Sequence, residues 1–263
     1  MSSGRVVFVS AGPGAADLIT LRGARALAQA DVVLADALAD PALRDLAPQA
    51  KWISVGKRGF EHSAKQTEIN ALLVKAAQEH ALVVRLKGGD ASIFGRLEEE
   101  LIALAEAGIA SDVVPGVTAA LAAAAQAGRP LTRRGRGRSV SLTTAMTEAG
   151  ELRAAQSADT EVFYMAGRQL AALGRQLLAA GWAESTPTLV VSRAGCADAL
   201  VSEHALADLA RAALLHRGRP TVVTVGTGAL PVPGQDQIRP AGKIVVSPET
   251  LPLKAPLTSQ SRS

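Results

Sequence analysis

Residues 83–96 are the stretch of this sequence best suited to bind a ligand. The run Val83-Val84-Arg85-Leu86-Lys87 has the composition of a strand and stops at Gly88-Gly89-Asp90. Paired glycines at the end of a strand let a ligand approach bare backbone, because no Cβ stands in the way. Asp90 adds a carboxylate to that opening, and Arg96 adds a guanidinium shortly after it. The stretch therefore predicts a ligand site at the carboxyl end of a strand.

Three further strands are expected to end beside this opening. Gly12-Pro13-Gly14 follows the apolar residues 6–10, Asp36 follows residues 32–35, and Lys57 follows residues 52–55. Ligands of α/β sheets bind at the carboxyl ends of the strands, so Asp36 and Lys57 are expected near the glycine pair. The first turn does not match a dinucleotide fingerprint, because Asp17 stands where that motif needs its third glycine.

Arginine is concentrated in two places that suit an anionic ligand. Arg96 precedes residues 98–100, three glutamates that would stabilise the start of a helix through its dipole. A cation at the same place is electrostatically unfavourable, so Arg96 favours a role in binding a carboxylate. Residues 129–138 hold five arginines and no acid, in a chain of net charge +4. This local excess suits an anionic ligand better than a general polyanion-binding surface.

The elements that would position these residues alternate as in parallel α/β units. In the first half, strands are expected at residues 6–10, 32–35, 52–55, 81–86 and 112–114. Helices are expected between them, at residues 18–30, 41–46, 65–79 and 97–107. Together they predict a first α/β domain of residues 1–117.

A second α/β domain is expected over residues 118–230. The alanine-rich residues 119–127 favour a helix, with Thr118 as a possible cap. Strands are expected after it, at residues 139–144, 161–165, 188–191 and 221–225. Residues 231–263 combine prolines with polar residues and have no helical period, which is typical of a flexible tail.

Composition excludes several classes of protein. The 263 residues are 48% hydrophobic and 20% charged, without the run of about 18 apolar residues that a membrane span needs. The amino terminus has no long apolar segment, so a cytoplasmic protein is expected. Cys196 is the single cysteine, which excludes an intramolecular disulfide and favours a structural or incidental thiol. The four histidines lack metal-ligand spacing, so no metal site is expected.

Several short motifs also occur in a fixed order along residues 5–228. The most specific are Arg85-Leu86-Lys87-Gly88-Gly89-Asp90 and Val55-Gly56-Lys57-Arg58. The others are Ala11-Gly12-Pro13-Gly14, Asp36, Gln66 with Ile69-Asn70, Ile93-Phe94-Gly95-Arg96, residues 113–119 and Pro130-Leu131-Thr132. The ordered set resembles the tetrapyrrole methylase family, and within it the uroporphyrinogen-III C-methyltransferases.

The resemblance implies two α/β domains with S-adenosylmethionine in the cleft between them, in a homodimer. Methylation of uroporphyrinogen III at C2 and then C7 would give precorrin-2, for sirohaem or cobalamin, and two S-adenosylhomocysteines. The family's cofactor contacts match Pro13, Gly88, Gly89, Asp90, Ile93, Thr118, Ala119, Met165 and Ala194. Its tetrapyrrole contacts match Arg96, Glu99, Arg134 and Met165, and its proton acceptor and donor match Asp36 and Lys57.

The substrate side departs from the family pattern more than the cofactor side. Ala91-Ser92 stands where the family has Pro-Phe, and Arg133 stands where it has histidine. Two alternatives therefore stay open: a precorrin C-methyltransferase acting at another ring carbon, and a cofactor-binding homologue with little turnover. An RNA 2′-O-methyltransferase is disfavoured, because only 3% of the residues are aromatic and no basic stripe is seen, so no nucleic-acid partner is expected.

Overall fold

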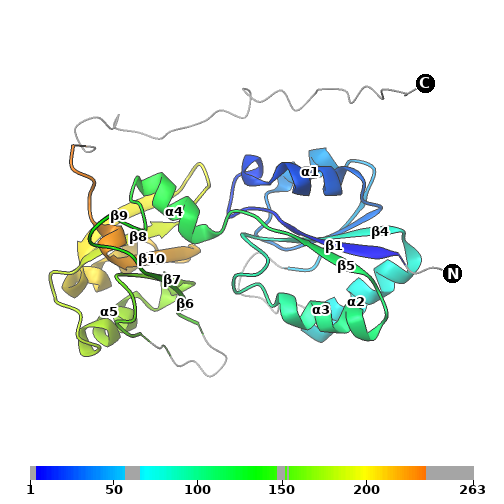
Figure 1. Cartoon of the computed structure of the whole chain (residues 1–263). Helices are drawn as coiled ribbons and strands as arrows, with labels where there is room; N and C mark the ends of the chain where they lie inside the picture. The colour runs from blue at the N-terminus through cyan, green and yellow to red at the C-terminus, as the bar shows by residue number, and fades with distance from the viewer. Residues whose placement is uncertain (1–3, 57–65, 147–151, 153, 235–263) are drawn as a thin grey trace.

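The chain forms two sheets joined end to end, each covered by helices on both faces (Figure 1). The computed structural model describes residues 4–56, 66–146, 152 and 154–234. Lys57 and the expected tail after residue 234 lie outside the described residues. No helix in the described part of the chain is long and apolar enough to span a membrane.

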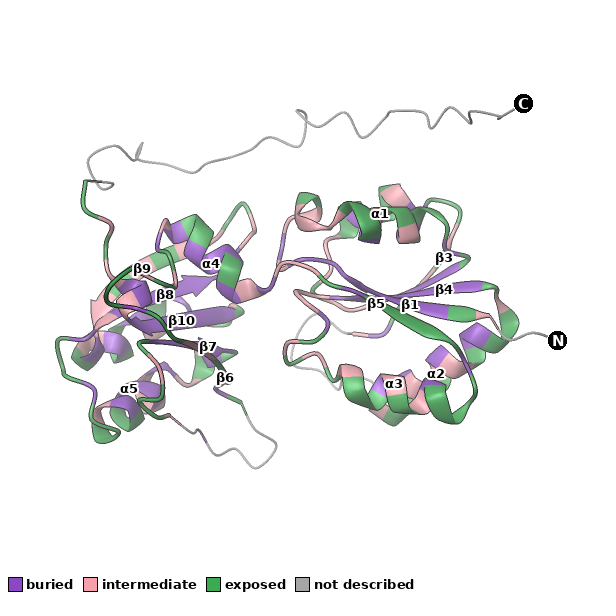
Figure 2. Cartoon of the chain, viewed as in Figure 1, coloured by how far each residue is buried: buried purple, intermediate pink, exposed green. Residues whose placement is uncertain are grey.

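The first sheet is parallel throughout, in the order β3-β2-β4-β1-β5. Its strands are β1 (Arg5–Ser10), β2 (Val32–Ala35), β3 (Lys51–Ser54), β4 (Leu82–Lys87) and β5 (Ser111–Val114). Parallel strands are buried on both faces, which is why β1, β2 and β4 are nearly continuous apolar runs. Figure 2 shows β1 and β4 buried along most of their length.

Helices cover both faces of this sheet. One face packs against α1 (Leu21–Ala28) and the 3-10 helix Pro41–Leu46, and the other against α2 (Gln66–Glu79) and α3 (Leu97–Glu106). The helix predicted at residues 18–30 is shorter because the Thr20 side chain accepts a hydrogen bond from Gly23 N and caps the helix there. Residues 41–46 form a 3-10 helix that begins at the Asp40 cap.

The second sheet is mixed, in the order β6-β7-β10-β8-β9. Its strands are β6 (Val140–Thr144), β7 (Thr160–Tyr164), β8 (Pro187–Ser192), β9 (Leu200–Ala205) and β10 (Thr221–Gly226). The expectation of parallel pairing was wrong for this half, since β10 is antiparallel to β7 and β8 and only β6 and β7 pair in parallel. The edge strand β9 was not predicted, because its sequence Leu-Val-Ser-Glu-His-Ala is partly polar and only half-buried.

Helix α4 (Ala119–Ala127) packs its alanines closely onto one face of the second sheet. On the other face lie α5 (Leu170–Ala179) and α6 (Ala212–Leu215). The division of the chain at residue 117 stays a prediction, and the packing of α4 on the second sheet supports it.

Candidate functional site

The carboxyl ends of the first sheet's parallel strands meet the second sheet at one junction (Figure 1). Backbone of the two halves is in direct contact there, since Ala15 N donates to Gly195 O at 3.0 Å. Pro13 is part of this contact, because a Cβ on Gly195 would lie 3.3 Å from Pro13 Cγ. Ala194, in the loop that follows β8, lies next to Gly195 and is buried. The structure therefore brings Pro13 and Ala194 together from opposite ends of the chain.

The turn after β4 exposes bare backbone, as its sequence predicts. Gly89 has φ +68°, which favours glycine, and a Cβ placed there would meet no atom within 4 Å. Its amide donates to Gly12 O at 2.7 Å and Gly12 N donates back to Gly89 O at 3.2 Å. The turns after β1 and β4 thus hold each other in place while one side of Gly89 stays open.

Asp90 is held as a carboxylate by three donors. Ser92 donates its amide and its hydroxyl to Oδ1, at 2.9 and 2.5 Å, and Gly116 N donates to Oδ2 at 2.8 Å. Partial burial raises the pKa of Asp90, but these hydrogen bonds outweigh it and leave the pKa below its usual value. Each carboxylate oxygen offers two lone pairs. Oδ1 already accepts two hydrogen bonds, so the remaining capacity for a ligand is on Oδ2.

An aromatic contact crosses the junction. The rings of Phe94 and Tyr164 lie edge to face with centroids 5.0 Å apart. The Tyr164 hydroxyl lies 2.8 Å from Thr118 Oγ1 and accepts from Ala120 N at 3.3 Å, and burial raises its pKa. Thr118 is the first residue of the α4 turn, but its side chain does not cap the helix as predicted, because it bonds Tyr164 instead. Ala119, within α4, packs beside Thr118 on the second sheet.

Four residues other than glycine have positive φ in the described part of the chain, and all follow strands that end at the junction. They are Phe94, Arg96, Met165 and Arg193, with φ between 52° and 56°. Left-handed backbone is costly for residues with a Cβ and clusters at functional sites. Ile93, next to Phe94, packs against the core of the second sheet. Met165 and Phe94 are both about two-fifths exposed and add an apolar rim.

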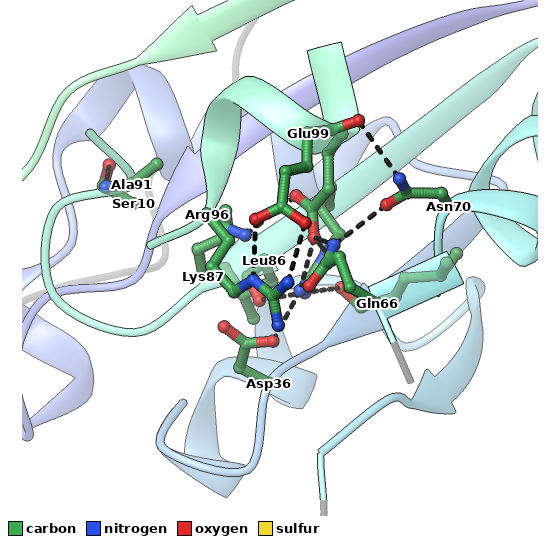
Figure 3. Close-up of polar contacts among 12 residues, drawn as sticks. Ser10, Asp36, Gln66, Asn70, Leu86, Lys87, Ala91, Arg96 and Glu99 are labelled. Atoms are coloured by element: carbon green, nitrogen blue, oxygen red, sulfur yellow. Dashed lines mark hydrogen bonds and ion pairs between the residues drawn. The ribbon is translucent and has the colours of Figure 1, made fainter. Parts of the chain in front are cut away.

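Arg96 and Glu99 form a two-pronged ion pair at the start of α3 (Figure 3). Nε and Nη2 of Arg96 donate to the two oxygens of Glu99, both at 2.7 Å. Hydrogen bonding from Arg96 holds the pKa of Glu99 below its usual value. Both side chains are about half exposed, so the pair is accessible from solvent.

Comparisons with known proteins identify the fold. The family model of tetrapyrrole (corrin/porphyrin) methylases matches residues 5–210. The chain belongs to the tetrapyrrole methylase family. It is 45% identical over 196 residues to a Pseudomonas aeruginosa uroporphyrinogen-III C-methyltransferase, covering 73% of this chain and 80% of that protein. A Hahella chejuensis siroheme synthase is 42% identical over 231 residues, which are 85% of this chain. The chain spans about half the length of that relative, 49%.

Solved structures of methylases have the same fold as this chain. The Thermus thermophilus uroporphyrin-III C-methyltransferase complexed with S-adenosylhomocysteine is 36% identical, with a TM-score of 0.75 over 85% of this chain and 97% of that one. A cobalt precorrin-4 methyltransferase is 28% identical, with a TM-score of 0.74 over 86% and 96% of the two chains. The predicted architecture of two α/β units is confirmed.

Asp36 lies at the carboxyl end of β2 in this methylase, beside a buried charge cluster that sequence reasoning missed. Arg85 donates to Asp36 Oδ1 at 2.6 Å and to Glu100, and Lys87 donates to Glu100 Oε2 at 2.8 Å. Burial and the neighbouring Arg85 lower the pKa of Lys87, although Glu100 acts in the opposite direction. Glu100 lies in the first turn of α3 as predicted, but it is fully buried and pairs with Arg85 and Lys87, which was not predicted. Two cations in a strand buried on both faces were the signal for this cluster.

The arginines of residues 129–138 do not all face one common ligand site. Arg129 is buried and ion-paired with Glu203 at 2.5 Å, and Arg133 donates to the carbonyls of Leu230 and Pro231. These two therefore brace the second domain, contrary to the expectation that they serve a ligand. Arg134 is exposed in the turn before β6, whereas Met165 follows the carboxyl end of the parallel strand β7. The structure does not bring Arg134 together with Met165.

Cys196 packs inside the junction of the methylase rather than at an open surface. A Cβ on Gly14 would lie 2.7 Å from Cys196 Sγ. Burial raises the pKa of the thiol, which disfavours the reactive thiolate. The structural interpretation of this cysteine is therefore supported.

Proposed function

We propose that this methylase transfers methyl groups from S-adenosylmethionine to C2 and C7 of uroporphyrinogen III, giving precorrin-2 and two S-adenosylhomocysteines. The observation that carries the proposal is the open Gly89-Asp90 turn at the junction, in a chain 45% identical to a uroporphyrinogen-III C-methyltransferase. Precorrin-2 would serve sirohaem or cobalamin formation.

The residues at the junction fit the cofactor. A Cβ at Gly89 would stand in open space, so ligand atoms can contact this backbone directly. Oδ2 of Asp90 can accept a hydrogen bond from a ligand hydroxyl group. Ile93, Met165 and Ala194 supply apolar side chains. The other residues proposed to contact the cofactor are Pro13, Gly88, Thr118 and Ala119. When bound, the cofactor supplies an activated methyl group, and the protein supplies the orientation of the two reactants.

The proposed substrate site combines arginines that bind carboxylates with one proton acceptor and one proton donor. Uroporphyrinogen III carries eight carboxylates, and arginine binds a carboxylate with two parallel hydrogen bonds. The proposed contacts for these carboxylates are Arg96, whose fork is paired with Glu99 in this structure, and Arg134, which lies in the exposed turn before β6. Asp36 is the proposed proton acceptor and Lys57 the proposed donor.

The test is turnover of the purified protein with uroporphyrinogen III and S-adenosylmethionine. We expect two moles of S-adenosylhomocysteine per tetrapyrrole, and a product heavier by two methylene units whose methyl groups are placed by NMR. Cofactor binding with no methylated product would instead support the homologue with little turnover. Rejection of uroporphyrinogen III together with methylation of a precorrin at another ring carbon would support the other alternative.

A homodimer is proposed alongside this activity. The support is the family resemblance, together with exposed apolar side chains on the second domain, Leu121, Leu142 and Met146. Light scattering on the eluted protein should give twice the 27.0 kDa of the chain. A monomer mass at working concentration would contradict the proposal.

A further inference from the structure

Strand β4 carries two cations on one buried face. Side chains two residues apart in a strand share a face, so Arg85 and Lys87 point the same way. Each is only 2% exposed. A buried charge is stable only when it is paired and hydrogen-bonded, and here two carboxylates, Glu100 and Asp36, balance the two cations.

Arg85 uses its whole guanidinium within this cluster (Figure 3). Nε donates to Glu100 Oε1 at 3.1 Å, and Nη1 donates to the carbonyls of Leu34 and Leu86 at 3.3 and 3.1 Å. Nη2 lies 2.6 Å from Asp36 Oδ1 and 3.0 Å from Glu100 Oε1. Because the carbonyls of Leu34 and Leu86 fix the plane of the guanidinium, its bond to Asp36 holds Oδ1 at a fixed place.

Asp36 is the one member of the cluster that reaches solvent. Its side chain is 32% exposed, whereas Glu100 is fully buried. Oδ1 is held by Arg85, and Oδ2 has no hydrogen-bond partner among the described residues. Asp36 also lines a hollow of about 390 Å³ at the ends of β2 and β3, with Trp52 and Arg44. Asp36 therefore combines one oxygen held by Arg85 with one that no described residue engages, at the carboxyl edge of the sheet.

The cluster also reaches the Arg96–Glu99 pair. Gln66 donates to Glu100 Oε1 at 3.3 Å and to Asn70 Oδ1 at 2.9 Å, and Asn70 donates to the backbone carbonyl of Glu99 at 3.1 Å. Asp36 and the first turn of α3 are thus tied to the same buried ion pair.

We propose that Arg85, held by Glu100, is a positioning residue that aims Oδ2 of Asp36 at the substrate as proton acceptor. This inference rests on the proposed function. In the reaction, a pyrrole carbon forms a bond to the methyl group while the methyl–sulfur bond breaks and its electron pair stays on sulfur. The ring then loses a proton to Asp36 Oδ2, which turns the carboxylate into a carboxylic acid until water takes the proton.

The kinetic test is a double-mutant cycle between Arg85→Lys and Asp36→Asn. Lysine keeps the positive charge and loses the planar fork. We expect Arg85→Lys to lower kcat at least tenfold with the S-adenosylhomocysteine Kd within twofold of the parent. In the Asp36→Asn background, the same change should alter kcat less than threefold, because the group it positions is already gone. Lys75→Gln, which removes the exposed ion pair with Glu79, is the matched control and should change neither quantity.

A purely structural role for Arg85 predicts a different pattern. Equal losses of kcat in both backgrounds, or a loss of cofactor affinity that parallels the loss of kcat, would overturn the proposal. If the Arg85→Lys variant does not fold, the double variant Arg85→Gln/Glu100→Gln takes its place in the cycle. This double variant removes the two opposite charges together.

A second measurement is independent of turnover. The carboxylate ¹³C resonance of Asp36, assigned by its loss in Asp36→Asn, should move in Arg85→Lys and Glu100→Gln and stay in place in Lys75→Gln. An unmoved resonance would refute positioning by Arg85. If the parent protein binds the cofactor but methylates no tetrapyrrole, the proposed function and the proton-acceptor role are both refuted. The Asp36 resonance would still decide whether Arg85 orients Asp36.

Discussion

Asp90 combines two roles at the scale of a single residue. Its carboxylate joins the turn after β4 to Gly116 in the segment before α4, and it is proposed to bind the cofactor. Ser92, which replaces the family's usual residue, adds a hydroxyl bond to the same carboxylate. The departure from the family pattern therefore strengthens the hold on Asp90.

Replacing Asp90 with Asn should weaken cofactor binding. Asparagine keeps one acceptor oxygen but loses the charge, and hydrogen bonds to charged groups are worth about 1.5–3 kcal/mol. We expect the Kd for S-adenosylhomocysteine, measured by calorimetry, to rise at least tenfold. Asp112→Asn, in β5, is the control and should leave the Kd unchanged. An unchanged Kd in Asp90→Asn would remove this residue from the cofactor site.

Sequence reasoning predicted the open residues of the site better than the buried ones. The positions of the glycine pair, Asp36 and Arg96 were predicted correctly because strand ends and helix starts are readable locally, and their roles in binding stay predictions. Arg85 and Glu100 were missed because their pairing joins residues 15 positions apart across a sheet and a helix. No local pattern specifies such a partner, although charge within an apolar strand predicts that one exists.

At the scale of elements, two glycines with the same backbone conformation allow an effect on stability to be distinguished from an effect on cofactor binding. Gly89 follows β4 and Gly108 follows α3, with φ +68° and +69°, and a Cβ at either would meet nothing within 4 Å. Alanine should cost about 1 kcal/mol of unfolding free energy at each position, because left-handed backbone is unfavourable for residues with a Cβ.

Only Gly89→Ala should also affect the cofactor, because its methyl group would occupy the open side of the turn. We expect similar losses of stability in urea for both variants, and a Kd for S-adenosylhomocysteine that rises in Gly89→Ala alone. Equal affinities for the two variants would show that the cofactor does not approach this backbone.

The start of α4 depends on a residue from β7. Tyr164→Phe removes the hydroxyl that accepts from Ala120 N and bonds Thr118, while the ring keeps its contact with Phe94. The expected loss of stability in urea is about 1–2 kcal/mol. Thr118→Val removes one of the same bonds, so the double variant should lose less than the sum of the two. Additive losses would indicate that the hydroxyls act separately.

The elements of the first sheet were readable from the sequence because its central strands β1, β2 and β4, buried on both faces, are mostly apolar. The second sheet was less readable. Strand direction in β10 depends on how the connections run over the sheet, and the half-buried edge strand β9 has no strong apolar period.

Stability of the whole molecule should fall in mild acid because of one histidine. His216 is fully buried between Ser192 and Ser202, and burial, with His204 and Arg219, lowers its pKa from 6.5 to about 4. Between these values the unfolded chain binds a proton that the fold excludes, so stability is complete above pH 6.5 and falls as pH drops toward 4. The loss over this window is about 3 kcal/mol.

The measurement is urea unfolding from pH 7.5 to 4.5. His216→Gln should lose less stability over this range than the parent, whereas Arg217→Gln, an exposed change one residue away, should follow the parent. Parallel curves for the parent and His216→Gln would show that this histidine is not the group responsible.

The four residues with positive φ beside the junction also have a consequence for protein engineering. Phe94, Arg96, Met165 and Arg193 each adopt a backbone that glycine or asparagine adopts at lower cost. A search for heat-resistant variants that ignored catalysis would therefore favour glycine or asparagine at these positions. Such a search would produce a more durable protein while removing the Phe94 ring that contacts Tyr164 in the other half of the molecule and the proposed ligand contacts Arg96 and Met165.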